Sequence, residues 1–194
     1  MIKVILSGII AYLLGSVTFG MIVPRLMGSD KDVRDEGSGN VGATNVLRTQ
    51  GKRQGVLVLI GDLLKGSAAA GLGLLLAGPA GGGAAGACAL LGHCYPLYFG
   101  FKGGKGVATA AGAVIVLFPK SMLFLVPVFV VAILGVRMVS VGSLAGAVTL
   151  AICLWMYPQP LPVTLCCMFA AAMIVGKHRG NIKRILSGTE SKLW

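Results

Sequence analysis

The sequence predicts an all-α membrane protein with seven transmembrane helices, an external N-terminus and a cytoplasmic C-terminus. Three observations support this fold class. Hydrophobic residues make up 56% of the 194 residues and charged residues only 12%, about half the charged fraction of a soluble domain. The apolar residues form long runs rather than an amphipathic pattern. The basic residues fall almost entirely on one side of these runs.

The first half of the chain holds three apolar runs and the longest polar segment. The first run, residues 4–24, is expected to be a retained span, because no A-x-A cleavage site follows it. The polar segment covers residues 25–54. Two further spans, 55–78 and 80–99, are separated only by Gly78-Pro79, which is a turn signal.

The second half contains apolar runs at 107–118, 121–136, 140–157 and 163–176. The run 107–118 would be about 18 Å long as a helix, short of the ~30 Å hydrocarbon core. Pro119-Lys120 separates it from the next run, so we expect two short or tilted helices, which gives seven spans. Without an internal repeat, residues 1–194 are expected to form a single domain.

The charge distribution determines the predicted orientation. With seven spans, all but Lys3 and Lys120 of the 17 Lys and Arg residues lie on one face, which the positive-inside rule identifies as cytoplasmic. Anionic lipid headgroups then account for the net charge of +11, and nucleic acid is not an expected partner. The five cysteines show no C-x-x-C spacing and mostly lie in apolar stretches, which predicts neither a metal site nor a disulfide framework.

The polar segment contains a glycine-rich stretch with short hydrogen-bond donors. Gly37, Gly39 and Gly42 match G-x-G-x-x-G, but no β-α-β unit surrounds them, so a dinucleotide-binding fold is disfavoured. Glycines nevertheless let successive backbone N–H groups converge on an anion. A flexible loop is the alternative. We favour a phosphate cradle, whose expected members are Ser38, Gly39, Asn40, Gly42, Thr44 and Asn45.

A second glycine-bearing segment, Lys102-Gly103-Gly104-Lys105-Gly106, leads directly into an apolar run. It is not a Walker A loop, because Phe99 stands where that motif requires glycine. Two ammonium groups beside a helix N-terminus form a strong site for a doubly charged phosphate. A patch for lipid headgroups is the alternative, but it would not need glycines. His93, which precedes the segment, either fixes this loop or acts in catalysis.

A third segment lies in the basic C-terminal tail, residues 177–190. His178 and Asn181 stand three residues apart, so a helix would place both on one face. The basic residues alone would fit an ordinary positive-inside tail, but the histidine and the amide favour a role in the site.

Four more polar residues stand within or at the start of apolar runs. Asp62 and Lys65 are expected to form a structural ion pair, with a role in the site as the second possibility. Ser140 and Ser143 either cap a helix or contact a phosphate.

Together and in this order, the three segments resemble the bacterial integral-membrane acyl-phosphate:glycerol-3-phosphate acyltransferases. The resemblance covers nearly the whole chain. Its motifs are Ser38-Gly39-Asn40-Val41-Gly42-Ala43-Thr44-Asn45, Gly92-His93 with Pro96 and Phe101-Lys102-Gly103-Gly104-Lys105-Gly106, and Lys177-His178-Arg179 with Asn181-Ile182. The H-x-x-x-x-D motif of acyltransferases that use acyl thioesters is absent, because Tyr98 follows His93 by five residues and Lys183 follows His178.

The resemblance implies transfer of a fatty acyl group from acyl phosphate to the 1-hydroxyl of glycerol 3-phosphate. The products would be 1-acylglycerol 3-phosphate (lysophosphatidic acid) and inorganic phosphate, in the first step of phospholipid synthesis. The expected location is the bacterial inner membrane, with the active site facing the cytoplasm. Acyl phosphate is a reactive mixed anhydride, so no cofactor and no metal are expected. The expected partners are the two substrates and membrane lipids, without an obligate protein partner.

The expected site has two phosphate-binding parts. The glycine-rich stretch would bind one phosphate, for which we favour that of the acyl donor; the sequence leaves open which phosphate occupies which part. Lys102, Gly103 and Gly104 would contribute to substrate binding. The residues expected to hold glycerol 3-phosphate are Lys105, Arg48, Ser143, His178 and Asn181. Of these, His178, Lys105 and Asn181 are the expected catalytic residues, and the base is either His178 or the phosphate of the donor.

Two other classes of protein remain as alternatives at this stage. The first is a transporter or channel for phosphorylated anions, although such sites lie near the bilayer midplane in repeated halves. The second is a lipid-binding scaffold, which would leave the three motifs without a role.

Overall fold

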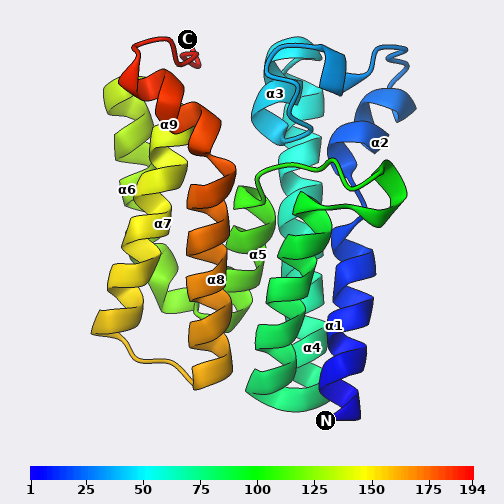
Figure 1. Cartoon of the computed structure of the whole chain (residues 1–194), viewed down its shortest axis with the longest axis vertical. Coiled ribbons are helices and arrows are strands. Elements are labelled where there is room, and N and C mark those ends of the chain that lie inside the picture. The colour runs from blue at the N-terminus through cyan, green and yellow to red at the C-terminus, as the bar shows by residue number, and fades with distance from the viewer.

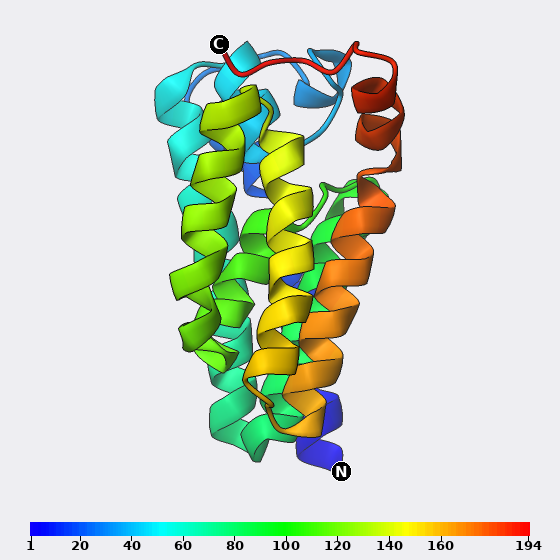
Figure 2. The same ribbon diagram turned by 90° about the vertical axis from the view of Figure 1, so that its left-hand side faces the viewer.

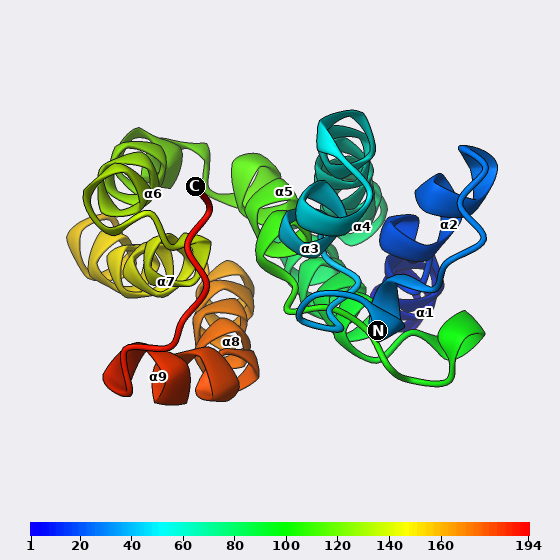
Figure 3. The ribbon, with the colours of Figure 1, turned by 90° about the horizontal axis from the view of Figure 1, so that it is seen from above.

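The computed structural model describes residues 1–194 and consists of helices and turns without strands (Figure 1). Seen from above, α1 to α4 lie on one side, α6 to α9 on the other, and α5 between them (Figure 3). The helices are α1 Ile2–Gly15, α2 Phe19–Leu26, α3 Ala43–Thr49, α4 Lys52–Cys94, α5 Val107–Leu117, α6 Met122–Val136, α7 Val139–Met156, α8 Leu161–Lys177 and α9 Arg179–Leu186, with short 3₁₀ turns at Val33–Asp35, Leu97–Phe99 and Pro119–Ser121.

The long element α4 is a hairpin of two helical arms. Helical geometry is interrupted at Ala77 (φ −148°) and at Gly78, whose φ of +59° lies in the left-handed region that favours glycine. Gly73 and Gly81 face each other on the two arms and leave no room for a side chain between them. In Figure 1 the first arm descends and the second returns upward beside α1. The turn predicted at Gly78-Pro79 is confirmed.

The first predicted span is broken between α1 and α2. The side-chain ammonium of Lys65 donates a hydrogen bond of 2.6 Å to the carbonyl oxygen of Val17, which lies in the break. The hydroxyl of Ser16 accepts a hydrogen bond from the backbone N–H of Leu97 at 3.2 Å. The Val17 carbonyl oxygen, which a continuous helix would have paired internally, is therefore satisfied by a residue from α4.

The short helix α5 begins well below the upper end of the bundle. Its 11 residues span about 16 Å, and the turn that starts at Pro119 separates it from α6, as predicted. The loop before it, residues 95–106, lies lower along the long axis than α3 and α9 in both side views (Figures 1 and 2). This loop, which carries the second glycine motif, is thereby recessed from the end of the molecule.

The outer surface of the bundle matches a lipid environment. Four helical segments are long and apolar enough to cross a membrane, and α8 with α9, bent by 52°, is a fifth candidate. Large apolar side chains point outward, for example Leu75 (85% exposed), Trp155 (84%) and Leu123 (74%), which would be unfavourable in water. The prediction of a multi-pass, all-α membrane protein is confirmed.

Candidate active site

The junction of α8 and α9 brings two predicted site residues to the end of the bundle. His178, which is 2% exposed, ends one helix and precedes the other. Its Nδ1 donates a hydrogen bond of 2.7 Å to the carbonyl oxygen of Ile174, because a carbonyl oxygen only accepts. In the neutral ring, Nε2 is therefore left as a proton acceptor. Asn181 follows within the first turn of α9 and is also buried.

Lys105 reaches from the recessed loop to α9. Its Nζ donates a hydrogen bond of 2.6 Å to Oδ1 of Asn181, so the second and third motifs meet. Burial lowers the pKa of Lys105 to about 8, the charge of Glu190 opposes this shift, and those of Arg184 and Arg48 add to it. Arg48 from α3 thus lies within electrostatic reach of the same ammonium group.

Glu190 is a central residue of this site that the sequence did not identify. Its carboxylate accepts hydrogen bonds from Asn181 Nδ2 (2.6 Å), Ser140 Oγ (2.7 Å) and Arg184 Nε (2.8 Å). Partial burial alone would raise the pKa of Glu190, but these hydrogen bonds outweigh it and hold the pKa below its ordinary value. One feature of the sequence could have indicated a role for Glu190 in the site: it is the single acidic residue after Asp62 in a strongly basic chain.

The C-terminal tail crosses from α9 toward the middle of the molecule (Figure 3). Arg48 donates to the carbonyl oxygens of Ser191 (3.0 Å) and Lys192 (3.3 Å). The backbone N–H of Leu193 donates to the carbonyl oxygen of Arg137 at 2.7 Å. The tail therefore connects α3 with the α6–α7 turn across the end of the bundle, and Arg48 is engaged by the tail backbone.

The first glycine motif forms a tight loop before α3. Gly37 and Gly39 have positive φ values (+58° and +68°), the geometry that lets N–H groups converge. Oδ1 of Asn45 accepts from the Ser38 backbone N–H at 2.9 Å and from its hydroxyl at 3.2 Å, and Nδ2 donates to the carbonyls of Val33 and Glu36.

The members of this motif consequently differ in accessibility. Asn45 is 2% exposed and its amide shapes the loop; its predicted contact with phosphate stays a prediction. Asn40 accepts from the Gly42 backbone N–H at 2.8 Å, so that N–H is already paired. Ser38 and Gly39 are exposed, and Thr44 is half-buried.

In the second motif, the two central glycines pack on His93. The backbone N–H of Gly104 donates to the His93 carbonyl oxygen at 3.2 Å, and any side chain at Gly103 or Gly104 would collide with the backbone or ring of His93. Of the two predicted roles of His93, the structure shows the one that fixes the loop. Lys102 is exposed, away from the contacts that hold Lys105.

The two serines at the start of α7 are both buried but differ in their contacts. Ser140 donates to Glu190, as described above. Ser143 is 3% exposed and donates to the Val139 carbonyl oxygen of its own helix at 2.9 Å. Its predicted contact with a substrate stays a prediction.

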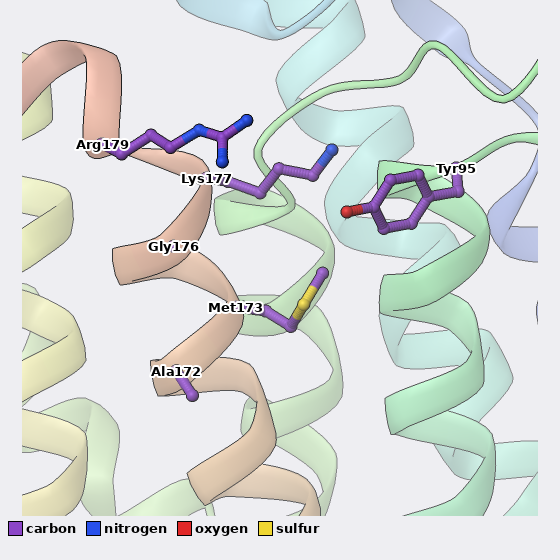
Figure 4. A pocket seen from close by; sticks show the side chains of 6 residues that line it. All are labelled: Tyr95, Ala172, Met173, Gly176, Lys177 and Arg179. Carbon is purple, nitrogen blue, oxygen red and sulfur yellow. The ribbon is translucent and has the colours of Figure 1, made fainter.

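A cavity of about 460 Å³ opens between α8 and the end of α4 (Figure 4). Ala172, Met173 and Gly176 line its apolar side, and Lys177, Arg179 and Tyr95 line its upper rim. Lys177 Nζ lies 3.9 Å from the centre of the Tyr95 ring, which is a cation–π contact across the opening. An apolar floor with a cationic rim suits an amphiphile with an anionic head.

These features define a class of protein. A lipid-facing helical bundle carries, at one end, a recessed lysine, an arginine, an amide and a histidine with a free ring nitrogen. This is an integral membrane protein with a site suited to a phosphorylated ligand.

Comparison with known proteins narrows this class to a family. The sequence profile described as glycerol-3-phosphate acyltransferase matches residues 5–188. A glycerol-3-phosphate acyltransferase of Syntrophotalea carbinolica is 42% identical over 184 residues, covering 94% of this chain and 93% of that protein. One from Aquifex aeolicus is 42% identical over 196 residues, covering 98% and 99%.

Solved structures agree with the sequence comparison. A crystal structure of PlsY, an integral membrane glycerol 3-phosphate acyltransferase, in its glycerol 3-phosphate form is similar with a TM-score of 0.92 at 41% identity, covering 97% of this chain and 94% of that one. Its lysophosphatidic acid form gives a TM-score of 0.89 at 40% identity, with the same coverage. The protein belongs to the glycerol-3-phosphate acyltransferase family, and the resemblance inferred from the three motifs is confirmed.

Proposed function

We propose that the protein transfers a fatty acyl group from acyl phosphate to the 1-hydroxyl of glycerol 3-phosphate. The hydroxyl oxygen attacks the acyl carbonyl carbon, and the bond between that carbon and the phosphate oxygen breaks. The products are 1-acylglycerol 3-phosphate and inorganic phosphate. Family membership supports this function over the transporter and scaffold alternatives.

The observation that carries the proposal is the contact between Lys105 and Asn181 within electrostatic reach of Arg48. An ammonium group has three donors, and Asn181 accepts one of them. The remaining donors, together with the Arg48 guanidinium, suit the phosphate of glycerol 3-phosphate. Binding in this way requires Arg48 to exchange its tail carbonyls for the substrate. Ser143 is proposed as a further member of this site.

His178 is the protein group best suited to accept the hydroxyl proton. Its Nδ1–H is held by the Ile174 carbonyl, which orients Nε2 as an acceptor. The phosphate of the donor is the alternative base. Activity of His178→Gln at only modestly reduced kcat would favour the phosphate as base.

We assign the donor phosphate to the loop around Ser38 and Gly39, and its acyl chain to the cavity between α4 and α8. The apolar floor and cationic rim of that cavity support the second assignment. A Cβ at Gly176 would meet nothing within 4 Å, so Gly176→Leu can place a side chain in the cavity that Gly176 lines. We expect it to raise KM for palmitoyl phosphate about tenfold and to leave KM for glycerol 3-phosphate unchanged. Gly146→Leu, also at open space, is the control, and equal effects of both variants would contradict the assignment.

We further propose seven spans, with the site facing the cytoplasm of a bacterial cell. The two arms of α4 count as separate spans, and the chain ends lie at opposite ends of the molecule (Figure 1), which supports an odd number. Accessibility of tags fused to the two ends tests this topology. Protease digestion of both tags from the same side of the membrane would contradict it.

The choice of acyl donor is tested directly with purified protein in detergent. Glycerol 3-phosphate is supplied with either palmitoyl phosphate or palmitoyl-CoA. We expect lysophosphatidic acid only with palmitoyl phosphate, with one inorganic phosphate released per product. Comparable product formation from the thioester would overturn the proposed donor.

A further inference from the structure

A cluster of buried polar residues lies directly beneath the recessed loop. Asp62 and Lys65 come from the first arm of α4, His93 from the end of its second arm, and Thr109 from the first turn of α5. All four are at most 4% exposed. Polar groups at such a depth in a membrane protein are costly unless they serve the structure or the function.

The contacts show more than the predicted ion pair. Asp62 Oδ1 lies 2.8 Å from Lys65 Nζ, which confirms the pair, and 3.5 Å from His93 Nδ1. Neither contact meets full hydrogen-bond geometry at Oδ1, but the distances bring the carboxylate against both groups. His93 Nδ1 instead shares a hydrogen bond of 3.1 Å with the hydroxyl of Thr109. Asp62 and Thr109 therefore hold the imidazole ring from two helices.

His93 in turn supports the loop that carries Lys105. Its carbonyl oxygen accepts from Gly104 N–H, and its ring fills the space beside Gly104 so closely that no side chain fits there. Lys105 is the next residue. A rotation of the imidazole would displace Gly104, and with it the ammonium group that reaches Asn181.

We propose that Asp62 and Thr109 are positioning residues that act through His93 to place Lys105 for glycerol 3-phosphate. The inference rests on the proposed function, because it concerns binding of that substrate. Lys65 has a separate task, since its ammonium also donates to the Val17 carbonyl oxygen and stabilises the break between α1 and α2. The cluster thus couples the packing of the membrane helices to the geometry of the phosphate site.

Thr109→Val tests the proposal, because it removes the hydroxyl and keeps the shape of the side chain. We expect KM for glycerol 3-phosphate to rise about tenfold with kcat changed less than about twofold. Thr109→Ser, which keeps the hydroxyl, should retain the wild-type KM. Thr149→Val is the matched control, because Thr149 bonds only the Ala145 carbonyl of its own helix. Asp62→Asn should also raise KM for glycerol 3-phosphate, and because it leaves the buried Lys65 ammonium without its counter-ion it should in addition lower the thermal midpoint.

Hydrogen exchange separates loop positioning from turnover. In Thr109→Val we expect the amides of residues 100–106 to exchange about tenfold faster, with other segments unchanged. An unchanged KM and unchanged exchange would overturn the proposal. Loss of kcat together with a lower thermal midpoint in Thr109→Val would also overturn it, because the cluster would then serve packing alone. Failure of the wild-type protein to turn over would count against the proposed function, whereas the exchange result would still decide the positioning role.

Discussion

Among single residues, Lys105 has the environment that most determines what the site binds. Burial lowers its pKa to about 8, yet the group remains mostly protonated at neutral pH. A partly desolvated ammonium interacts with a phosphate more strongly than one in water. Its contact with Asn181 directs it toward the junction of α8 and α9.

Removal of this ammonium is expected to abolish most activity. Lys105→Ala should lower kcat/KM for glycerol 3-phosphate by about 100-fold or more, because a charge-assisted hydrogen bond to phosphate is lost. Lys120→Ala, an exposed lysine at the opposite end of the bundle, is the control and should stay within about twofold of wild type. Similar losses in both variants would exclude a specific role of Lys105.

The lowered pKa of Lys105 predicts a pH dependence with a definite sign. Only the protonated amine binds phosphate, so kcat/KM for glycerol 3-phosphate should be flat just below pH 8 and fall about tenfold per pH unit above it. In Lys105→Arg, the guanidinium stays charged to about pH 12, so whatever activity remains should lack this fall. A wild-type profile that stays flat to about pH 10 would show that the charge of Lys105 is not required.

From the sequence it was possible to predict site residues whose side-chain type itself suggests binding or proton transfer. Roles that depend on contacts made only in the folded chain were missed. Lys105, His178 and Asn181 were predicted together and are brought to one place. The sequence did not show that the amide of Asn45 holds the loop, because Val33 and Glu36 offer carbonyls that only the folded chain brings near. Glu190 was not predicted because its donors come from two separate helices.

At the scale of elements, close packing between α4 and α5 depends on glycines. A side chain at Gly66 would collide with the Thr109 backbone, and one at Gly112 with the Leu63 backbone. Small residues allow such approach between helices in a membrane. This packing places the start of α5, and therefore the recessed loop, against the first arm of α4.

Gly66→Ala is expected to force α4 and α5 apart. We expect a loss of about 1–3 kcal/mol in the free energy of unfolding, as for other overpacked cores, seen as a lower thermal midpoint. Gly71→Ala on the same helix faces open space and should be neutral or slightly stabilising. An equal midpoint for the two variants would contradict the packing account.

Glu190 is one of the residues that hold the C-terminal tail. Because its pKa is held below 4.5, the stabilisation from its charge is complete above that pH and is lost as pH falls through the lowered pKa. Glu190→Gln should remove this contribution at neutral pH and increase hydrogen exchange of residues 187–194. Asp30→Asn, at an exposed acidic residue, is the control. Equal exchange of the tail in Glu190→Gln and wild type would show that the charge does not hold it.

The boundaries of helices were predictable where a proline or glycine in the helix ends it. They were not predictable where the end of a helix depends on contacts with residues far along the chain. The turn at Gly78-Pro79 and the break at Pro119 followed from local chemistry. The break between α1 and α2 did not, because it depends on Lys65 and Leu97, far along the chain from Val17 and Ser16.

In the whole molecule, residues within or next to three motifs that are far apart in sequence converge at one end of a helical bundle. Arg48, Lys105 and Asn181 come from α3, the recessed loop and α9, and the apolar surface below them faces lipid. Such an arrangement suits the proposed reaction, in which a water-soluble phosphate ester meets a membrane-embedded acyl donor. The order of motifs indicated this function from the sequence, whereas the recess and the tail across it required the structure.

The most direct measurement is the release of inorganic phosphate from palmitoyl phosphate by the purified protein, with and without glycerol 3-phosphate. We expect release that depends on glycerol 3-phosphate, equals the lysophosphatidic acid formed, and disappears in Lys105→Ala. Release at the same rate without glycerol 3-phosphate, or none despite measurable binding of glycerol 3-phosphate, would contradict the proposed function.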